Sequence, residues 1–143
     1  MRVPGSEGIL AAIGEIATKA SAWLSVLSLS GDTVQQDYYR HYGYAADAPN
    51  FAKGLLPGSF ATTANGPPLT GLQAQQQLAL PARSGLPNAY YNVTVPRGLV
   101  PVEGPTPVEP EPDYNNAPGG GIQYRFPEGT PPGSVTGPYP LPP

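Results

Sequence analysis

Apolar and polar residues alternate with a period of two along several short stretches of the chain, and this alternation is typical of β-strands. In one stretch, Tyr91, Val93 and Val95 share one side, and the polar Asn92 and Thr94 lie between them. An aromatic run ending near Gly43 has high β-propensity and is a second stretch of this kind. The pattern predicts strands at 37–44, 88–95 and 122–126, a strand or loop at 59–63, a brief pairing at 99–102 and a last edge strand at 134–136.

Elsewhere the apolar residues recur every three or four positions, which indicates helices. From Ile9 to Leu27 they form one stripe, so we expect an amphipathic helix that packs on the body of the protein or on a partner. Contact with a membrane is the second alternative, and no transmembrane span is expected. A short helix is expected within 45–55, with Asp47 as its N-cap. Another is expected over 71–80, because Thr70 is a good N-cap and Pro81 ends the helix.

Composition sets the size and class of the fold. The chain has 143 residues, of which 21 are Pro and 18 are Gly, a level that is common in disordered chains. Nine tyrosines and a charged fraction of 12% argue against disorder, because disordered chains are poor in aromatic residues and rich in charge. We therefore expect a compact, loop-rich α+β domain at 35–143, preceded by the helix and linker at 1–34. The Pro/Glu-rich segment 103–113 is expected to be an extended, exposed loop or a lid.

Charge and rare residues exclude several kinds of site. The chain has no cysteine and one histidine, so neither a thiolate nor a His-rich metal site can form, and we expect no metal. A net charge of −3 gives no general electrostatic footprint for nucleic acid, which disfavours a duplex-binding module. No Gly-x-Ser-x-Gly elbow, P-loop lysine or Gly-x-Gly-x-x-Gly turn is present.

The run 116–126, Asn-Ala-Pro-Gly-Gly-Gly-Ile-Gln-Tyr-Arg-Phe, is the most informative part of the chain. Three glycines allow unusual backbone angles and a close approach of the backbone to a ligand. They lead directly into the predicted strand, where Gln123 and Arg125 lie on the polar side. The run is consistent with a strand that carries a functional amide, and also with a Gly-rich turn that feeds an ordinary edge strand.

The order of these elements resembles the ADP-ribosyltransferase fold. More narrowly, residues 37 to 140 are similar to toxin domains at the C-termini of bacterial polymorphic toxins of the Rhs type, and the Pro-Gly-Gly-Gly-Ile-Gln-Tyr element is similar to that of the necrotizing-toxin NAD glycohydrolases. The resemblance implies a compact split β core with short helices. It also implies that NAD is the substrate and that its nicotinamide–ribose bond is cleaved.

The resemblance assigns roles to individual residues of this chain. Gln123 would touch the nicotinamide ribose and is the main catalytic candidate, while Tyr90 or Tyr91 would pack on the nicotinamide. Where many transferases carry a glutamate, this chain has Arg125, so Glu128 or the segment 103–111 would assist, or the acceptor would be water or a reactive nucleophile. The residues implied to hold NAD are Arg40, His41, Tyr42, Tyr90, Tyr91 and Arg125.

Each of these residues also has a plain structural interpretation. A single histidine in an aromatic strand is often a hydrogen-bonded structural residue, and most of the tyrosines are expected to be core residues under any interpretation. The functional expectation is a secreted toxin that acts in the cytoplasm of a target cell and transfers ADP-ribose to an unknown macromolecule. Its partners would include a cognate immunity protein. The alternatives are an NAD glycohydrolase with water as the acceptor, and a non-enzymatic Pro/Gly-rich structural or assembly protein.

Overall fold

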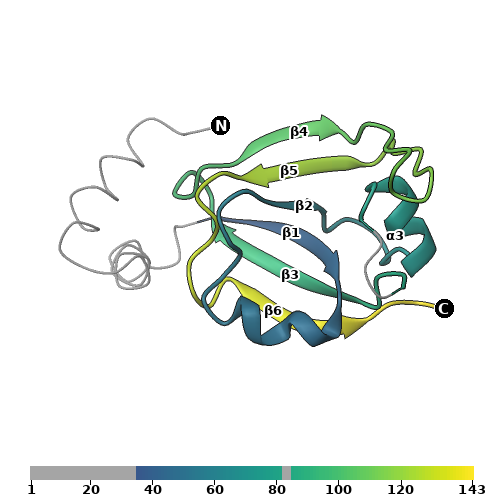
Figure 1. Cartoon of the computed structure of the whole chain (residues 1–143). Coiled ribbons are helices and arrows are strands. Elements are labelled where there is room, and N and C mark those ends of the chain that lie inside the picture. The colour runs from purple at the N-terminus through teal and green to yellow at the C-terminus, as the bar shows by residue number, and fades with distance from the viewer. Residues whose placement is uncertain (1–34, 82–84) are drawn as a thin grey trace.

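The computed structural model describes residues 35–81 and 85–143, so the expected helix between Ile9 and Leu27 lies outside the described residues. The described chain is of the α+β class, as expected, with one antiparallel sheet and few helices (Figure 1). In chain order the elements are β1 (Gln36–Gly43), the 3-10 helix η2 (Ala45–Phe51), β2 (Ser59–Thr63), α3 (Gly71–Gln77), β3 (Ala89–Pro96), β4 (Glu103–Pro107), β5 (Ile122–Phe126) and β6 (Val135–Pro140).

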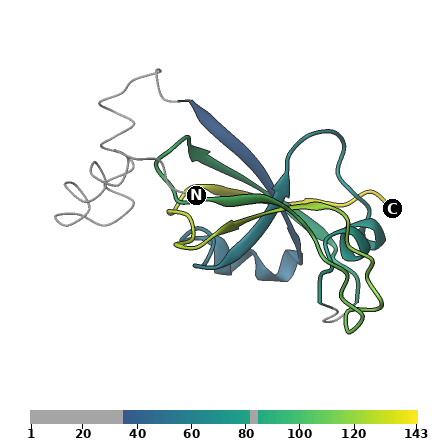
Figure 2. The ribbon, with the colours of Figure 1, turned by 90° about the horizontal axis from the view of Figure 1, so that it is seen from above.

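The six strands lie in the order β4-β5-β2-β1-β3-β6. Of the strand pairings in the sheet, the one between β1 and β2 has the fewest residue pairs. β1 pairs with β3 along its whole length, from Gln36 to Gly43. With β2 it pairs at only two positions, Tyr39 with Thr63 and Arg40 with Thr62. Seen from above, β1 runs at an angle to β4 and β5 (Figure 2). The sheet is therefore two three-stranded halves that cross at these two pairs.

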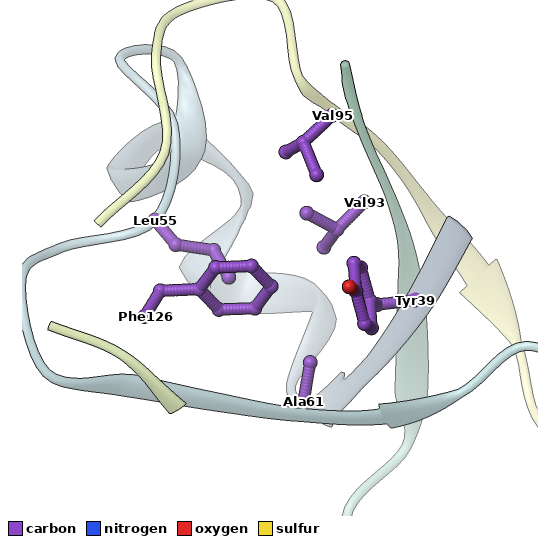
Figure 3. Close-up of a cluster of buried hydrophobic side chains, with 6 residues drawn as sticks. All are labelled: Tyr39, Leu55, Ala61, Val93, Val95 and Phe126. Carbon is purple, nitrogen blue, oxygen red and sulfur yellow. The ribbon is translucent and has the colours of Figure 1, made fainter. Parts of the chain in front are cut away.

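The main core fills the angle between the two halves of the sheet. Phe126 of β5 is fully buried, and its ring meets the ring of Tyr39 of β1 edge-on at a centroid distance of 5.2 Å. Val93 of β3 and Leu55, from the segment after η2, project into the same space (Figure 3). Alternation along β3 is as expected, because Tyr91, Val93 and Val95 are all buried on one side. The core members are Tyr39, Leu55, Ala61, Val93, Val95 and Phe126.

A second, smaller core joins α3 to the segment 108–121. α3 begins as expected at Thr70, whose hydroxyl accepts from the backbone of Gln73 while the Gln73 side chain accepts from the backbone of Thr70. Gln75 of α3 is fully buried, and its side-chain nitrogen donates to the backbone oxygen of Tyr114 at 2.7 Å. Leu78, Ala79, Val108 and Ala117 pack together beside it.

The glycines before β5 permit a close approach of backbone to backbone. The amides of Gly119 and Gly121 donate to the carbonyl oxygens of Gln76 and Gln77 at 3.0 Å each. A Cβ atom on Gly121 would lie 2.9 Å from the Gln77 oxygen, which is closer than real Cβ atoms come. The triglycine was predicted to allow a backbone to approach a ligand, and in the structure the partner it approaches is the end of α3.

The structure corrects the expected course of the Pro-rich segments. The loop expected at 103–113 begins with a strand, β4, which pairs with β5, and the last strand extends to Pro140 instead of ending at 136. Both are edge strands, and an edge strand tolerates proline because half of its amides need no ladder partner. The expected pairing at 99–102 is absent from the described residues, where Val100 and Val102 instead pack on the main core.

The two short helices also differ from expectation at their ends. η2 is a 3-10 helix that ends at Phe51, its N-cap is Tyr44, and Asp47 lies within the first turn instead of at the cap. α3 ends at Gln77, three residues before the expected end. The chain leaves the helix there because Ala79 has a positive φ of 50°, a conformation that a helix cannot contain.

Replacing Phe126 by Ala should lower the free energy of unfolding by about 3–5 kcal/mol, because a fully buried aromatic ring is removed from the main core. Phe60, on the neighbouring strand β2, is 47% exposed and provides a matched control, for which we expect a loss below about 1 kcal/mol. Urea denaturation of both variants measures the difference. Equal losses would contradict the placement of the core between the two halves of the sheet.

Candidate active site

A pocket of about 290 Å³ opens where β1 and β2 diverge beyond their two pairs. We call it the seam pocket. It brings Arg40, His41 and Tyr42 of β1 together with Gln123 of β5, which is about 80 residues away in the sequence. Residues of β2 and the region after α3 complete the wall. The lining residues are Arg40, His41, Tyr42, Ser59, Phe60, Ala61, Thr62, Leu78, Leu80, Val108 and Gln123.

The strand register explains why Arg40 and Gln123 meet. Arg40 is paired with Thr62, and Arg125 is paired with Phe60. Since side chains two residues apart on a strand lie on the same face, Gln123 and Thr62 lie on the face that carries Arg125 and Phe60. Arg40 and Gln123 therefore flank Thr62 on one face, with Cα atoms about 10 Å apart across two strand spacings.

Arg40 is a buried cation in the wall of the seam pocket. Its side chain is 8% exposed, and one terminal nitrogen donates to the carbonyl oxygens of Ala64 and Gly66 at 3.3 Å each. Its guanidinium also lies 5.1 Å from the centre of the Tyr90 ring. The Nε atom is buried and has no hydrogen-bond partner among the described residues. Arg40 thus keeps one N–H donor unused.

His41 bridges the divergence between the two strands. Its Nδ1 lies 2.7 Å from the carbonyl oxygen of Phe60, so Nδ1 carries the proton and Nε2 is left as an acceptor in the neutral ring. The ring also packs against Phe51 and Tyr91, at centroid distances of 5.3 and 6.3 Å. His41 therefore has a structural role at the seam, and its expected contact with a ribose hydroxyl stays a prediction that only Nε2 can satisfy.

The tyrosines named from the sequence occupy different environments. Tyr42 lines the seam pocket, and its phenol oxygen accepts from the backbone of Leu69 at 2.8 Å. Tyr91 is in the core and donates to the carbonyl oxygen of Tyr44, so its ring does not reach the pocket. Tyr90 lies beneath Arg40 on the pocket face of the sheet but does not line the pocket. Neither of the two candidates for a nicotinamide contact lines the pocket, so that contact stays a prediction.

Gln123 is the second residue of β5 and follows the triglycine directly. The hydrogen bond from Gly121 to Gln77 fixes the start of this strand against α3. The partly buried Gln123 side chain has no hydrogen-bond partner among the described residues. Its amide is therefore held at the pocket wall by the backbone and is available to a ligand.

Arg125 and Glu128 do not line the seam pocket. Arg125 forms an ion pair with Glu103 of β4 at 3.0 Å. Glu128 lies beyond the other end of β5, five residues from Gln123, which corresponds to about 16 Å along an extended chain. The assistance expected from Glu128 stays a prediction, but this separation places it outside the pocket.

The sequence analysis did not predict the apolar wall of the pocket. Leu78 and Leu80 follow α3, and Val108 comes from the segment after β4. These residues meet only because the small second core joins α3 to the segment 108–121. The sequence of β2 offered one signal for a pocket here, because a large aromatic residue, Phe60, stands on the polar side of the strand, which is unusual. In the structure Phe60 is 47% exposed.

Comparisons of the chain with protein-family models, curated proteins and solved structures returned no match. Within residues 35–81 and 85–143, no group of three or more His, Cys, Asp or Glu side chains is arranged to hold a metal ion. No helix in the same ranges is long and apolar enough to cross a membrane. Any assignment of function therefore rests on the sequence and on the chemistry of the residues that the structure brings together.

The pKa of His41 provides a test of its role at the seam. Burial lowers this pKa from its ordinary value, partly offset by the bond to Phe60 and by the charge of Asp47. The unfolded chain therefore takes up the proton first, so stability is complete above about pH 6.5 and falls as the pH drops from there toward the lowered folded value.

We expect His41→Gln to remove this part of the pH dependence and to cost about 1 kcal/mol at pH 7.5, because the seam loses the hydrogen bond to Phe60. The measurement is urea denaturation at intervals from pH 5 to 8. The exposed Gln36→Ala variant is the control and should keep the wild-type profile. A His41→Gln profile with the wild-type slope would contradict a titrating histidine at the seam.

Proposed function

We propose that the seam pocket binds NAD and that the protein cleaves its nicotinamide–ribose bond, with water as the favoured acceptor. The observation that carries this proposal is the convergence of Arg40, His41 and Tyr42 with Gln123 in one pocket. The sequence resemblance to ADP-ribosyltransferase-fold toxins named these residues as one site. The divergence of β1 from β2 also supports the split β core that the resemblance implies.

The size and charge of the pocket fit one half of a dinucleotide. A volume of about 290 Å³ is at the lower end of the range for small-molecule sites, so one nucleoside unit would enter and the remainder would extend out of the pocket. Among the described lining residues, Arg40 carries the only full charge at neutral pH. A buried guanidinium with an unused N–H favours an anionic group, and the diphosphate of NAD supplies one.

The reaction requires positioning more than strong acid catalysis. Nicotinamide leaves C1′ of the ribose with the bonding electron pair and becomes neutral, and the ribosyl carbon gains oxocarbenium character. The Gln123 amide would hold a ribose hydroxyl and so fix C1′ in the orientation that leads to cleavage. Water then forms the new C–O bond at C1′ and loses a proton to solvent, which balances the reaction.

Water is favoured as the acceptor because no carboxylate is found among the described lining residues. Transfer to a protein side chain generally needs a base that activates the acceptor. Glu103 is engaged by Arg125, and Glu128 lies beyond the far end of β5. An acceptor that is already reactive would need no base, so transfer of ADP-ribose to a macromolecule is the second candidate.

In a cell, either reaction would consume NAD, so the protein would act as a toxin. The proposal therefore includes, as the resemblance implies, a secreted effector that works in the cytoplasm of a target cell. The producing cell would then need an immunity protein, and the mouth of the seam pocket is where such a partner would block NAD. A structural or assembly protein is the rival proposal, and it predicts no NAD turnover.

Gln123→Ala should reduce NAD cleavage roughly a hundredfold to a thousandfold, because it removes a positioned hydrogen-bonding group at a developing charge. Its stability should change by less than about 1 kcal/mol, since the side-chain amide makes no hydrogen bond to the residues that the structure describes. Release of nicotinamide from purified protein measures the rate. Gln36→Ala, at the exposed start of β1, is the matched control and should keep full activity.

Two outcomes of this experiment would contradict the proposal in different ways. Undiminished cleavage by Gln123→Ala would show that Gln123 is not catalytic. Absence of nicotinamide release by the unaltered protein would overturn the NAD reaction itself and favour the structural alternative.

The acceptor can be identified with NAD labelled in the adenosine moiety. We expect the purified protein alone to convert it to free ADP-ribose and nicotinamide in equal amounts. We also expect addition of bacterial lysate to leave the label in the small-molecule fraction. Label that appears in protein or nucleic acid with the wild-type chain, and not with Gln123→Ala, would replace hydrolysis by transfer.

A further inference from the structure

A second pocket opens on the other side of the two pairs that join β1 to β2, where β2 has ended and the first residues of β1 continue. Its volume is about 310 Å³, and it shares no lining residue with the seam pocket. Asn65, in the loop that follows β2, is one of its lining residues and is exposed. Water therefore has free access to Asn65.

Asn65 is followed by Gly66, and this is the only Asn-Gly sequence in the chain. An asparagine before a glycine is especially prone to deamidation, because glycine has no Cβ to hinder attack of its own amide nitrogen on the asparagine side chain. Every other asparagine of the chain precedes a residue that has a Cβ. The sequence thus singles out Asn65 as the asparagine that should deamidate first.

The structure leaves the reacting groups of this pair free. Within the described residues, neither the side chain of Asn65 nor the amide N–H of Gly66 makes a hydrogen bond. A Cβ atom placed on Gly66 would meet nothing within 4 Å, so the loop has room to rearrange. By contrast, the side chain of Asn88 accepts from the backbone of Ala45 at 2.8 Å.

The loop that contains this pair also holds Arg40. One terminal nitrogen of Arg40 donates to the carbonyl oxygens of Ala64 and Gly66, at 3.3 Å each. Among the described residues these are the only hydrogen-bond acceptors of the guanidinium. The two carbonyl groups lie on either side of Asn65 in the main chain, so a change in their spacing changes how Arg40 is held.

We propose that Asn65 is a site of spontaneous deamidation and that its isoaspartyl product releases Arg40 from the loop. The amide nitrogen of Gly66, after losing its proton to hydroxide, attacks Cγ of Asn65 and forms a cyclic imide. The side-chain nitrogen leaves as ammonia with a proton from water, which regenerates hydroxide. A water molecule then opens the ring at one of its two carbonyl carbons and leaves a carboxylate.

The two ways of opening the ring have different effects on the loop. Cleavage between the Gly66 nitrogen and Cγ leaves an aspartate in a normal main chain. Cleavage between the same nitrogen and the main-chain carbonyl carbon of residue 65 leaves isoaspartate, whose main chain runs through Cβ and Cγ and is one carbon longer. The extra carbon lies between the carbonyl groups of Ala64 and Gly66. They then lose the spacing at which both accept from one nitrogen of Arg40.

The modification alters the seam pocket from outside, because Arg40 lines that pocket and Asn65 does not. The chemical step and the release of Arg40 do not depend on the reaction assigned to the seam pocket. Only the effect on activity rests on the proposed function: NAD cleavage would decline as the protein ages, since the cation that favours the diphosphate is no longer held in place.

The test is incubation of the full chain for several days in mildly alkaline buffer, followed by peptide mass analysis and enzymatic methylation of isoaspartyl groups. We expect the peptide that contains residue 65 to gain the mass difference between an oxygen atom and an NH group, and to become a methyl acceptor. The peptide with the exposed Asn115 and Asn116 should stay unchanged over the same period. Asn65→Gln is the matched control and should stay unmodified, because a glutamine would have to form a larger ring.

The effect on Arg40 is measured on the separated isoaspartyl form. Its NMR spectrum should show a shifted Nε–H signal of Arg40. Its folding equilibrium constant, from urea denaturation, should be roughly tenfold lower, which corresponds to the loss of about one net hydrogen bond. Nicotinamide release should fall in proportion to the modified fraction in the unaltered chain and stay constant in Asn65→Gln.

Two results would overturn the proposal. The first is deamidation at Asn65 that is no faster than at Asn115 or Asn116. The second is an isoaspartyl form that keeps both the Arg40 Nε–H signal and the stability of the fresh protein. Absence of nicotinamide release from fresh protein would contradict the proposed function alone, because the mass, NMR and denaturation measurements still decide the modification and its effect on Arg40.

Discussion

The short contact between β1 and β2 is the constraint on which the rest of the molecule depends. Two residue pairs join strands that each continue with another partner, β1 with β3 and β2 with β5. Because sheets twist, two halves joined over so short a length diverge on both sides of the contact. The core occupies the angle between the halves, and one pocket opens at each end of the contact. The short contact between β1 and β2 therefore accounts for the position of the core and for the positions of both pockets.

The divergence of two strands does not by itself form a pocket. The seam pocket also depends on residues that form its outer wall. α3 and the segment 108–121 provide the outer wall through Leu78 and Val108. They are held together by the buried Gln75 and by the glycine amides that donate to the end of α3. The same glycines place Gln123 at the start of β5, so one set of contacts builds the wall and positions the amide.

Sequence reasoning identified the central strands, but not how the candidate site is enclosed. Of the residues it named, Arg40, His41, Tyr42 and Gln123 line one pocket, and the others do not. Alternation located β3, and a capping pattern located the start of α3 at Thr70, because both signals depend on neighbours along the chain. The strand at Glu103–Pro107 was missed, since its prolines are tolerated only at an edge and edge position is a property of the whole sheet. The bond from His41 to Phe60 was missed for the same reason, because it depends on where β1 and β2 diverge.

Arg40 makes the strongest physical argument for an anionic ligand in the seam pocket. Within the part of the chain that the structure describes, Arg40 is a buried cation that faces carbonyl dipoles and an aromatic ring, which is costly, and one unused buried N–H adds about 1–3 kcal/mol. An apolar side chain of similar length would avoid this cost and could still cover Tyr90. Under the proposed function, a diphosphate group in the seam pocket would offset the charge of the guanidinium. Binding of the diphosphate would then recover part of the cost that Arg40 imposes on the free protein, and this supports the proposal for the seam pocket.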